Sequence, residues 1–272
     1  MTDTTSAPPT TAVGYERRGC AAWLRLQRPE KMNAIDPDVL DGLTSGLAQA
    51  KADGARAVVI TGAGGVFCAG ADLKHAMRGL DDLCGLERLL EDAEALMRAI
   101  EHHPTPVIAA VNGTAIAGGF ELVLACDIVI AAQEALLSDG HAKYGLFPGG
   151  GSTARLPRIV GPSRAKHLLF TGRTATAAEM RELGVVTEVV AGEELETAVS
   201  ELCERIARGS AASLARMKRA VGVGLDLPLD EALALELAVA KEHLRSADVA
   251  EGLAAFAEGR SPRFGTVARD IR

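Results

Sequence analysis

Two segments of this chain each join a short apolar strand to a helix through a turn of small residues. The first reads FCAGADLK at residues 67–74, and the second reads PVIAAVNG at residues 106–113 and continues into AGGFEL at residues 117–122. Small residues let the backbone approach a ligand closely, and the first N–H groups of a helix have no acceptor inside it. Two such amides that converge on one carbonyl oxygen form an oxyanion hole. The segments therefore predict an α/β fold whose turns serve a reaction that builds negative charge on a carbonyl, such as enolate formation.

Strands and helices also alternate along the rest of the chain. Apolar runs typical of strands lie at residues 23–26, 57–62, 107–111 and 127–132, and helical patterns start near Asp36 and cover residues 79–100 and 121–126. This alternation predicts an α/β chain with a buried, largely parallel sheet, and by itself it is also compatible with a doubly wound sheet. From residue 202 onward the pattern is helical. We therefore expect a disordered tail at residues 1–11, a core at residues 12–201 and a C-terminal helical segment at residues 202–272.

Composition and charge argue against several classes of protein. The 272 residues carry a formal net charge of −7, which is unfavourable for a general nucleic-acid binder. The five cysteines form no C-x-x-C pair, and the adjacent His102 and His103 diverge in direction without a third ligand, so we expect free thiols and no metal. No apolar run approaches the roughly 20 residues that span a membrane. We expect a cytoplasmic protein, and we do not expect residues 1–11 to be a signal or transit peptide.

Five ordered motifs resemble the crotonase, or enoyl-CoA hydratase/isomerase, family. Besides the two segments above, they are RPEKMNA at residues 28–34, GLFPGGG at 145–151 with RLP at 155–157, and ADVAEGLAAF at 247–256. The resemblance extends over roughly residues 12–265. It implies a crotonase-like spiral of ββα units that ends in a C-terminal helical oligomerisation segment. It also implies an acyl-CoA substrate with no separate cofactor, and assembly into a homotrimer or a dimer of trimers.

The resemblance further implies which residues form the catalytic centre. Ala71 and Gly118 match the two positions whose backbone amides form the family's oxyanion hole. Losing one such donor typically lowers the rate by about a hundred- to a thousand-fold. Glu121 matches the first of two catalytic glutamates in the hydratases. Because Glu121 lies near a helix N-terminus, we expect its pKa to be lowered, which suits a base.

The second catalytic glutamate is replaced by His141. The family segment P-E-x-x-x-G-x-x-P places that glutamate four residues before a glycine and twenty after the first glutamate, and both counts reach His141, from Gly145 and from Glu121. Histidine has an unperturbed pKa of about 6.5 and serves as an acid or a base near neutral pH. A relative that cleaves a carbon–carbon bond of a β-diketone also has histidine there, but its partnering aspartate corresponds to Gly150. Asp139 is the alternative partner that would orient His141.

A further group of residues matches positions that contact coenzyme A in the family. These residues are Lys31, Ala69, Asp72, Leu73, Lys74, Phe256 and Arg260. Lys74 follows the AGAD turn and offers a mobile positive charge for phosphate. Phe256 and Arg260 lie where the family's C-terminal helix reaches the adenine end of coenzyme A, including that bound by a neighbouring subunit.

The residues together favour hydration of a 2-enoyl-CoA, with Glu121 and His141 flanking the α- and β-carbons of the substrate. Double-bond isomerisation, which needs one base, is the second hypothesis, and hydrolysis of a carbon–carbon bond of a β-diketone is the third. A catalytically silent CoA-binding subunit is a hypothesis of another class. The replaced glutamate favours that last hypothesis, whereas the intact turns and Glu121 oppose it.

Overall fold

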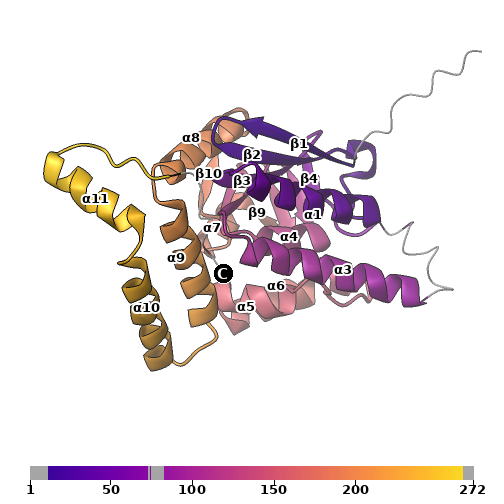
Figure 1. Cartoon of the computed structure of the whole chain (residues 1–272). Helices are drawn as coiled ribbons and strands as arrows, with labels where there is room; N and C mark the ends of the chain where they lie inside the picture. Colours follow the sequence, from indigo (N-terminus) through magenta and orange to yellow (C-terminus); the bar gives the residue numbers. More distant parts are fainter. Residues whose placement is uncertain (1–11, 73, 75–82, 266–272) are drawn as a thin grey trace, which may run out of the picture.

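The computed structural model describes residues 12–72, 74 and 83–265, and two β-sheets form the centre of this part of the chain (Figure 1). The larger sheet has the order β1-β2-β3-β5-β7-β10, with strands β1 (Val13–Arg18), β2 (Ala21–Leu26), β3 (Ala57–Gly62), β5 (Val107–Val111), β7 (Ile128–Ala132) and β10 (Glu188–Val190). The smaller sheet has the order β4-β6-β8-β9, with strands β4 (Val66–Cys68), β6 (Thr114–Ile116), β8 (Leu136–Ser138) and β9 (Ala175–Thr176).

The chain passes from one sheet to the other and back, so it winds as a spiral. Strands β3, β5 and β7 pair in parallel in the larger sheet, and β4, β6 and β8, which follow them in sequence, pair in parallel in the smaller one. Along the chain, β3 and β4 are followed by helix α3 (Leu83–His102), β5 and β6 by α4 (Gly118–Ala125), and β7 and β8 by α5 (Ser152–Val160). The spiral of ββα units is thereby confirmed, and the doubly wound alternative is excluded.

The remaining helices lie around and beyond the sheets. They are η1 (Pro29–Lys31), α1 (Pro37–Ala52), η2 (His141–Tyr144), α6 (Pro162–Thr171), α7 (Ala177–Glu182), η3 (Gly192–Glu194), α8 (Leu195–Ala207), α9 (Ala211–Gly224), α10 (Leu229–His243) and α11 (Ala247–Glu258). Helix α1 begins where the sequence predicts, because the Asp36 carboxylate accepts a hydrogen bond from the Val39 amide at 3.1 Å. The predicted helix at residues 79–100 corresponds to α3, and its residues 79–82 lie outside the described residues.

The central strands β3, β5 and β7 of the larger sheet are buried on both faces, which explains their nearly continuous apolar sequences. Side chains alternate along each strand: in β2, Leu24 and Leu26 join the main core with α1 and α3, whereas Trp23 points to the opposite face. That second face is covered by Leu195, Val199 and Cys203 of α8. Helix α8 therefore packs on the sheet and crosses residue 201, where we expect the core to end. The division into a core and a C-terminal segment stays a prediction.

The last three helices extend away from the sheets, and α10 and α11 are the outermost elements in Figure 1. Helix α9 is attached to the core through Lys218, whose Nζ donates to the Asp127 carboxylate at 2.6 Å and to the Ile100 carbonyl at 2.9 Å. The same Asp127 oxygen accepts the Val107 amide at the start of β5, at 2.7 Å. One lysine thus links the C-terminal helices to the ends of α3 and β5.

The described residues contain neither a helix suited to span a membrane nor a cluster of side chains suited to a metal ion. None of the helices among them is both long and apolar enough to cross a bilayer. Nor do three or more His, Cys, Asp or Glu side chains gather there in a way that suits a metal ion.

Candidate active site

The two small-residue turns meet, and their glycines are needed for the contact. Gly70 has a φ of +89°, and a Cβ atom there would lie 2.9 Å from the Ala117 Cβ and 3.1 Å from the Gly118 amide nitrogen. A Cβ on Gly119 would lie 2.1 Å from the carbonyl oxygen of Cys68, closer than real atoms approach. The AGA turn after β4 therefore lies directly against the start of α4, as the oxyanion-hole hypothesis requires.

The amides of Ala71 and Gly118 lie close together and are left available by the turns. A Cβ built on Gly118 would be 3.7 Å from the Ala71 nitrogen. On either side of Ala71, Ile35 donates to the Gly70 carbonyl and accepts the Asp72 amide, each at 2.8 Å. Within the described part of the chain, neither the Ala71 amide nor the Gly118 amide has a hydrogen-bond acceptor. The geometry is compatible with a shared carbonyl oxygen as their acceptor.

The turn before α4 contains a strained residue that the sequence does not reveal. Ala117 has φ 51° and ψ −119°, a conformation that L-residues rarely adopt and that costs on the order of 1–3 kcal/mol. Its amide donates to the Ser138 carbonyl at 3.0 Å, which holds the turn in place. This conformation brings the first turn of α4 against Gly70.

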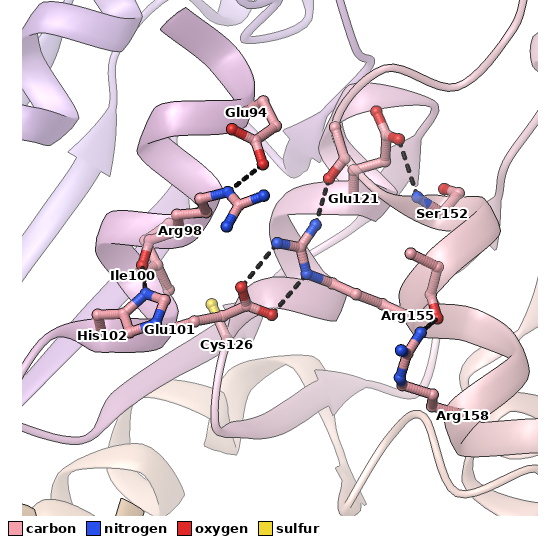
Figure 2. Close-up of polar contacts among 12 residues, drawn as sticks. Glu94, Arg98, Ile100, Glu101, His102, Glu121, Cys126, Ser152, Arg155 and Arg158 are labelled. Carbon is pink, nitrogen blue, oxygen red and sulfur yellow. Dashed lines mark hydrogen bonds and ion pairs between the residues drawn. The ribbon is translucent and has the colours of Figure 1, made fainter. Parts of the chain in front are cut away.

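Glu121 is buried beneath this turn with only 3% of its surface exposed. Its Oε1 accepts a hydrogen bond from the Ser152 amide at 3.0 Å (Figure 2). Burial raises the pKa of Glu121, and the smaller opposing effects of the Ser152 amide, His141 and the Gly150 amide do not cancel it. The expected lowering of this pKa was wrong, because desolvation outweighs the helix N-terminus.

His141 lies at the start of η2 and is paired with Asp139, which follows β8. Their Nδ1 and Oδ2 atoms are 3.1 Å apart, and both side chains are largely buried, so the expected contact is confirmed. Burial alone would lower the pKa of His141. The opposing effects of Asp139 and, to a smaller extent, Glu121 are larger together, so the pKa of His141 is raised. Conversely, burial opposes ionisation of Asp139, whereas His141 and Ser152 lower its pKa. Glu121 and His141 are therefore near enough to influence each other's ionisation.

Ser152 is a residue of this site that sequence reasoning missed. Besides its amide, which binds Glu121, it brings a fully buried hydroxyl that lowers the pKa of Asp139. Among the described residues, Ser152 Oγ, Asp139 Oδ2 and His141 Nδ1 are buried yet make no well-aligned hydrogen bond, despite the short Asp139–His141 separation. Such under-used polar atoms are unusual in a protein interior and form a polar cluster beside Glu121. The sequence feature that could have identified Ser152 is its position directly after three glycines.

Four of the residues expected to contact coenzyme A surround the AGA turn. The carboxylate of Asp72 is buried and lies 3.2 Å from Arg28 and 3.8 Å from the half-exposed Lys31. Asp72 thus holds the turn against η1. The Ala69 amide strengthens this contact, because it donates to the Met32 carbonyl at 3.1 Å. Lys74 is exposed.

Of the other three expected residues, Phe256 and Arg260 are not brought to this site within the single chain. Leu73 lies outside the described residues. Phe256 is 88% exposed on α11, and Arg260, just beyond that helix, pairs with Glu251 at 2.6 Å. Figure 1 shows α11 well separated from α4, which carries Glu121.

Comparison with known proteins identifies the family. The sequence model of the enoyl-CoA hydratase/isomerase family matches residues 16–267. A probable enoyl-CoA hydratase of Rhodobacter capsulatus is 40% identical over 254 residues, which cover 93% of this chain and 97% of the relative. The mitochondrial enoyl-CoA hydratase domain-containing protein 2 of Bos taurus is 36% identical over 267 residues, covering 93% and 90% of the two chains.

A solved structure agrees with these sequence relatives. The crystal structure of an enoyl-CoA hydratase from Bacillus anthracis matches with a TM-score of 0.90 at 35% identity, covering 94% of this chain and all of that one. The match extends over nearly the whole chain, so it confirms the predicted fold class. From its sequence, its relatives and its fold, this chain belongs to the enoyl-CoA hydratase/isomerase family.

Proposed function

We propose that this protein hydrates a 2-enoyl-CoA, with the thioester carbonyl bound between the amides of Ala71 and Gly118. Two observations support the proposal. Glu121 and His141 lie near enough to influence each other's ionisation. Glu121 also lies in the first turn of the helix that begins at Gly118, and the adjacent amides of Gly118 and Ala71 have no acceptor within the described chain. Membership of the family supports an acyl-CoA substrate. The amides would stabilise the negative charge that develops on the carbonyl oxygen.

In the proposed reaction, Glu121 acts as the base and His141 as the acid. The Glu121 carboxylate takes a proton from water, the resulting hydroxide bonds to the β-carbon, and the electrons of the double bond move onto the carbonyl oxygen. The enolate then collapses and the α-carbon takes a proton from His141. Asp139 favours the protonated ring because it raises the pKa of His141. The net change is addition of one water, and proton exchange with solvent restores both groups.

One observation favours a second candidate function. A carboxylate against Nδ1 is also how a histidine is held as a general base, and Asp139 supplies that carboxylate where Gly150 cannot. Hydrolysis of a carbon–carbon bond of a β-diketone is therefore the second candidate. In that reaction His141 would need to be neutral, whereas its raised pKa favours the charged form and thus hydration.

We further propose that the protein assembles into a homotrimer or a dimer of trimers. Helices α9, α10 and α11 expose large apolar side chains, which argues for a covered surface in the assembled protein. On these helices or directly after them, the exposed side chains are Met217, Val221, Val223, Leu225, Leu229, Leu233, Leu237, Leu244, Leu253 and Phe256. Phe256 and Arg260 would then serve the coenzyme A of a neighbouring subunit. The free cysteines favour a reducing, cytoplasmic location.

The experiment that tests the proposed reaction compares three substrates. The protein is incubated with crotonyl-CoA, a 3-enoyl-CoA and a cyclic β-diketone, and the products are identified by mass spectrometry. Hydration of crotonyl-CoA is expected to be the fastest reaction. Turnover of the diketone alone would favour the second candidate, and tight binding of crotonyl-CoA without any turnover would show a catalytically silent subunit.

A further inference from the structure

Arg155 lies near Glu121 and connects two parts of the chain that are far apart in sequence. Its guanidinium donates to both carboxylate oxygens of Glu101, at 2.6 Å and 2.7 Å, and to the carbonyl of Gly150 at 2.5 Å. Figure 2 shows Arg155 between Glu101 of α3 and the turn that reaches Glu121. The Arg155 side chain is only 15% exposed, which strengthens this bidentate pair relative to a surface ion pair.

The turn formed by Gly150 and Gly151 is enclosed between two charged side chains. A Cβ on Gly150 would lie 2.8 Å from Oε2 of Glu121, and one on Gly151 would lie 1.8 Å from a guanidinium nitrogen of Arg155. The Glu121 carboxylate and the Arg155 guanidinium thus occupy the space that side chains would need on either face of the turn. Ser152 follows directly, and its amide donates to Glu121.

We propose that Arg155, held by Glu101, is a positioning residue that fixes this turn so that the Ser152 amide holds the Glu121 carboxylate. The inference rests on the proposed role of Glu121 as the base. The connection runs from Glu101 to Arg155, from Arg155 to the Gly150 carbonyl, and from the Ser152 amide to Glu121. Misplacement of a reacting group by about 1 Å can cost about a hundred-fold in rate, so the effect on turnover is large.

Arginine is required here for its shape as well as its charge. Its planar fork binds both oxygens of one carboxylate and still donates to a carbonyl, which a lysine ammonium does not reproduce. The charged groups that act on Glu121 are His141, Asp139 and Arg155. Arg155→Lys keeps the charge and removes the fork, so it separates positioning from simple electrostatic attraction.

The test compares Arg155→Lys, Arg155→Met and Glu101→Gln with the control Arg158→Ala. Arg158 lies on the same helix but is exposed, and it contacts the Ala154 carbonyl and Asp226 instead of the turn. Both Arg155 variants are expected to lower kcat for crotonyl-CoA by about ten- to a hundred-fold with little change in KM, because the amides of the oxyanion hole remain. Glu101→Gln should lower kcat less, and Arg158→Ala should leave it unchanged. Circular dichroism and the Tm identify any variant that fails to fold.

A second readout does not depend on turnover. In protein labelled with ¹³C-glutamate, the carboxyl signal of Glu121 is assigned by its absence in Glu121→Gln and is titrated with pH. Losing the Ser152 hydrogen bond should raise the pKa of Glu121 by about one unit in Arg155→Lys, and Arg158→Ala should not move it.

The two readouts distinguish the failure of this inference from the failure of the proposed function. If wild-type protein hydrates crotonyl-CoA but folded Arg155→Lys keeps both its kcat and the pKa of Glu121, the positioning role is wrong. If wild-type protein hydrates nothing but the pKa still rises in Arg155→Lys, the positioning role holds and the proposed reaction is wrong.

Discussion

At the scale of single residues, the ionisation of Glu121 and His141 decides what the site can do. Glu121 must lose its proton to act as a base, and His141 must keep its proton to act as an acid. Burial raises the pKa of Glu121 above its ordinary value of about 4.3, and Asp139 and Glu121 raise that of His141 above about 6.5. We therefore expect a bell-shaped pH profile of kcat for crotonyl-CoA that rises through the first pKa and falls through the second.

Asp139→Asn tests the assignment of the alkaline limb. Because Asp139 is the main group that raises the pKa of His141, its neutralisation should move the alkaline limb of the profile to lower pH. The acidic limb, set by Glu121, should move much less. His141→Ala should remove the alkaline limb and lower kcat by roughly a hundred- to ten-thousand-fold. An unchanged profile in both variants would show that His141 takes no part in proton transfer.

Glu121→Gln is expected to abolish turnover and yet raise the Tm. The native state holds the Glu121 proton to higher pH than the unfolded state does, so its ionisation disfavours folding at pH 8. Removing the buried charge should raise the Tm there by roughly 2–4 °C. The difference should shrink as the pH falls through the native pKa, which differential scanning calorimetry at pH 8 and pH 5 can follow. A lower Tm at both pH values would contradict the role of burial.

The sequence predicts the residues of this site better than their electrostatics. Glu121 and His141 are found by spacing from their motifs, and Asp139 by its nearness to His141 in the chain. The predicted direction of the pKa shift of Glu121 was wrong. The residues that enclose its carboxylate, Gly150 and Ser152, lie about thirty positions away in the sequence. Local sequence shows a helix N-terminus but not the desolvation produced by a distant turn.

At the scale of elements, the close contact between the AGA turn and α4 depends on glycines. Gly119→Ala is expected to destabilise the protein by about 1–3 kcal/mol, because the new methyl group would lie 2.1 Å from the Cys68 carbonyl. Gly118→Ala is the matched control for folding, since its nearest neighbours would be a flexible Ile35 methyl at 3.2 Å and the Gly70 Cα at 3.5 Å. Urea denaturation measures both. Equal stability of the two variants would contradict the described packing.

Strands marked by continuous apolar runs were predictable, and the shortest strands were not. The strands at 57–62 and 107–111 have the predicted bounds, because continuous apolar runs mark strands that are buried on both faces. Strands β6 and β8 have three residues each, too few to show a period. Helix α4 begins at Gly118, before the predicted residue 121, because two glycines weaken a helical pattern without preventing a helix from starting there.

At the scale of the whole molecule, the exposed apolar side chains of the last three helices support assembly. Leu233 on α10 is 52% exposed in the single chain. If these helices form the subunit interface, Leu233→Glu should dissociate the assembly, which sedimentation velocity would detect as a smaller species. Glu236→Lys, a change of charge on the same helix, is a control for altered charge alone. An unchanged sedimentation coefficient in Leu233→Glu would place the interface elsewhere.

The proposed function requires Glu121 and His141 together to add water to a thioester bound at the two turns. The most direct measurement is the rate of crotonyl-CoA hydration by wild-type protein, Glu121→Gln and His141→Ala, with the Kd for acetoacetyl-CoA determined for each by calorimetry. We predict hydration by the wild type, losses of at least about a hundred-fold in both variants, and similar Kd values in all three, because the backbone amides are unchanged. Wild-type protein that binds acetoacetyl-CoA but does not hydrate crotonyl-CoA would contradict the proposal, as would full activity in either variant.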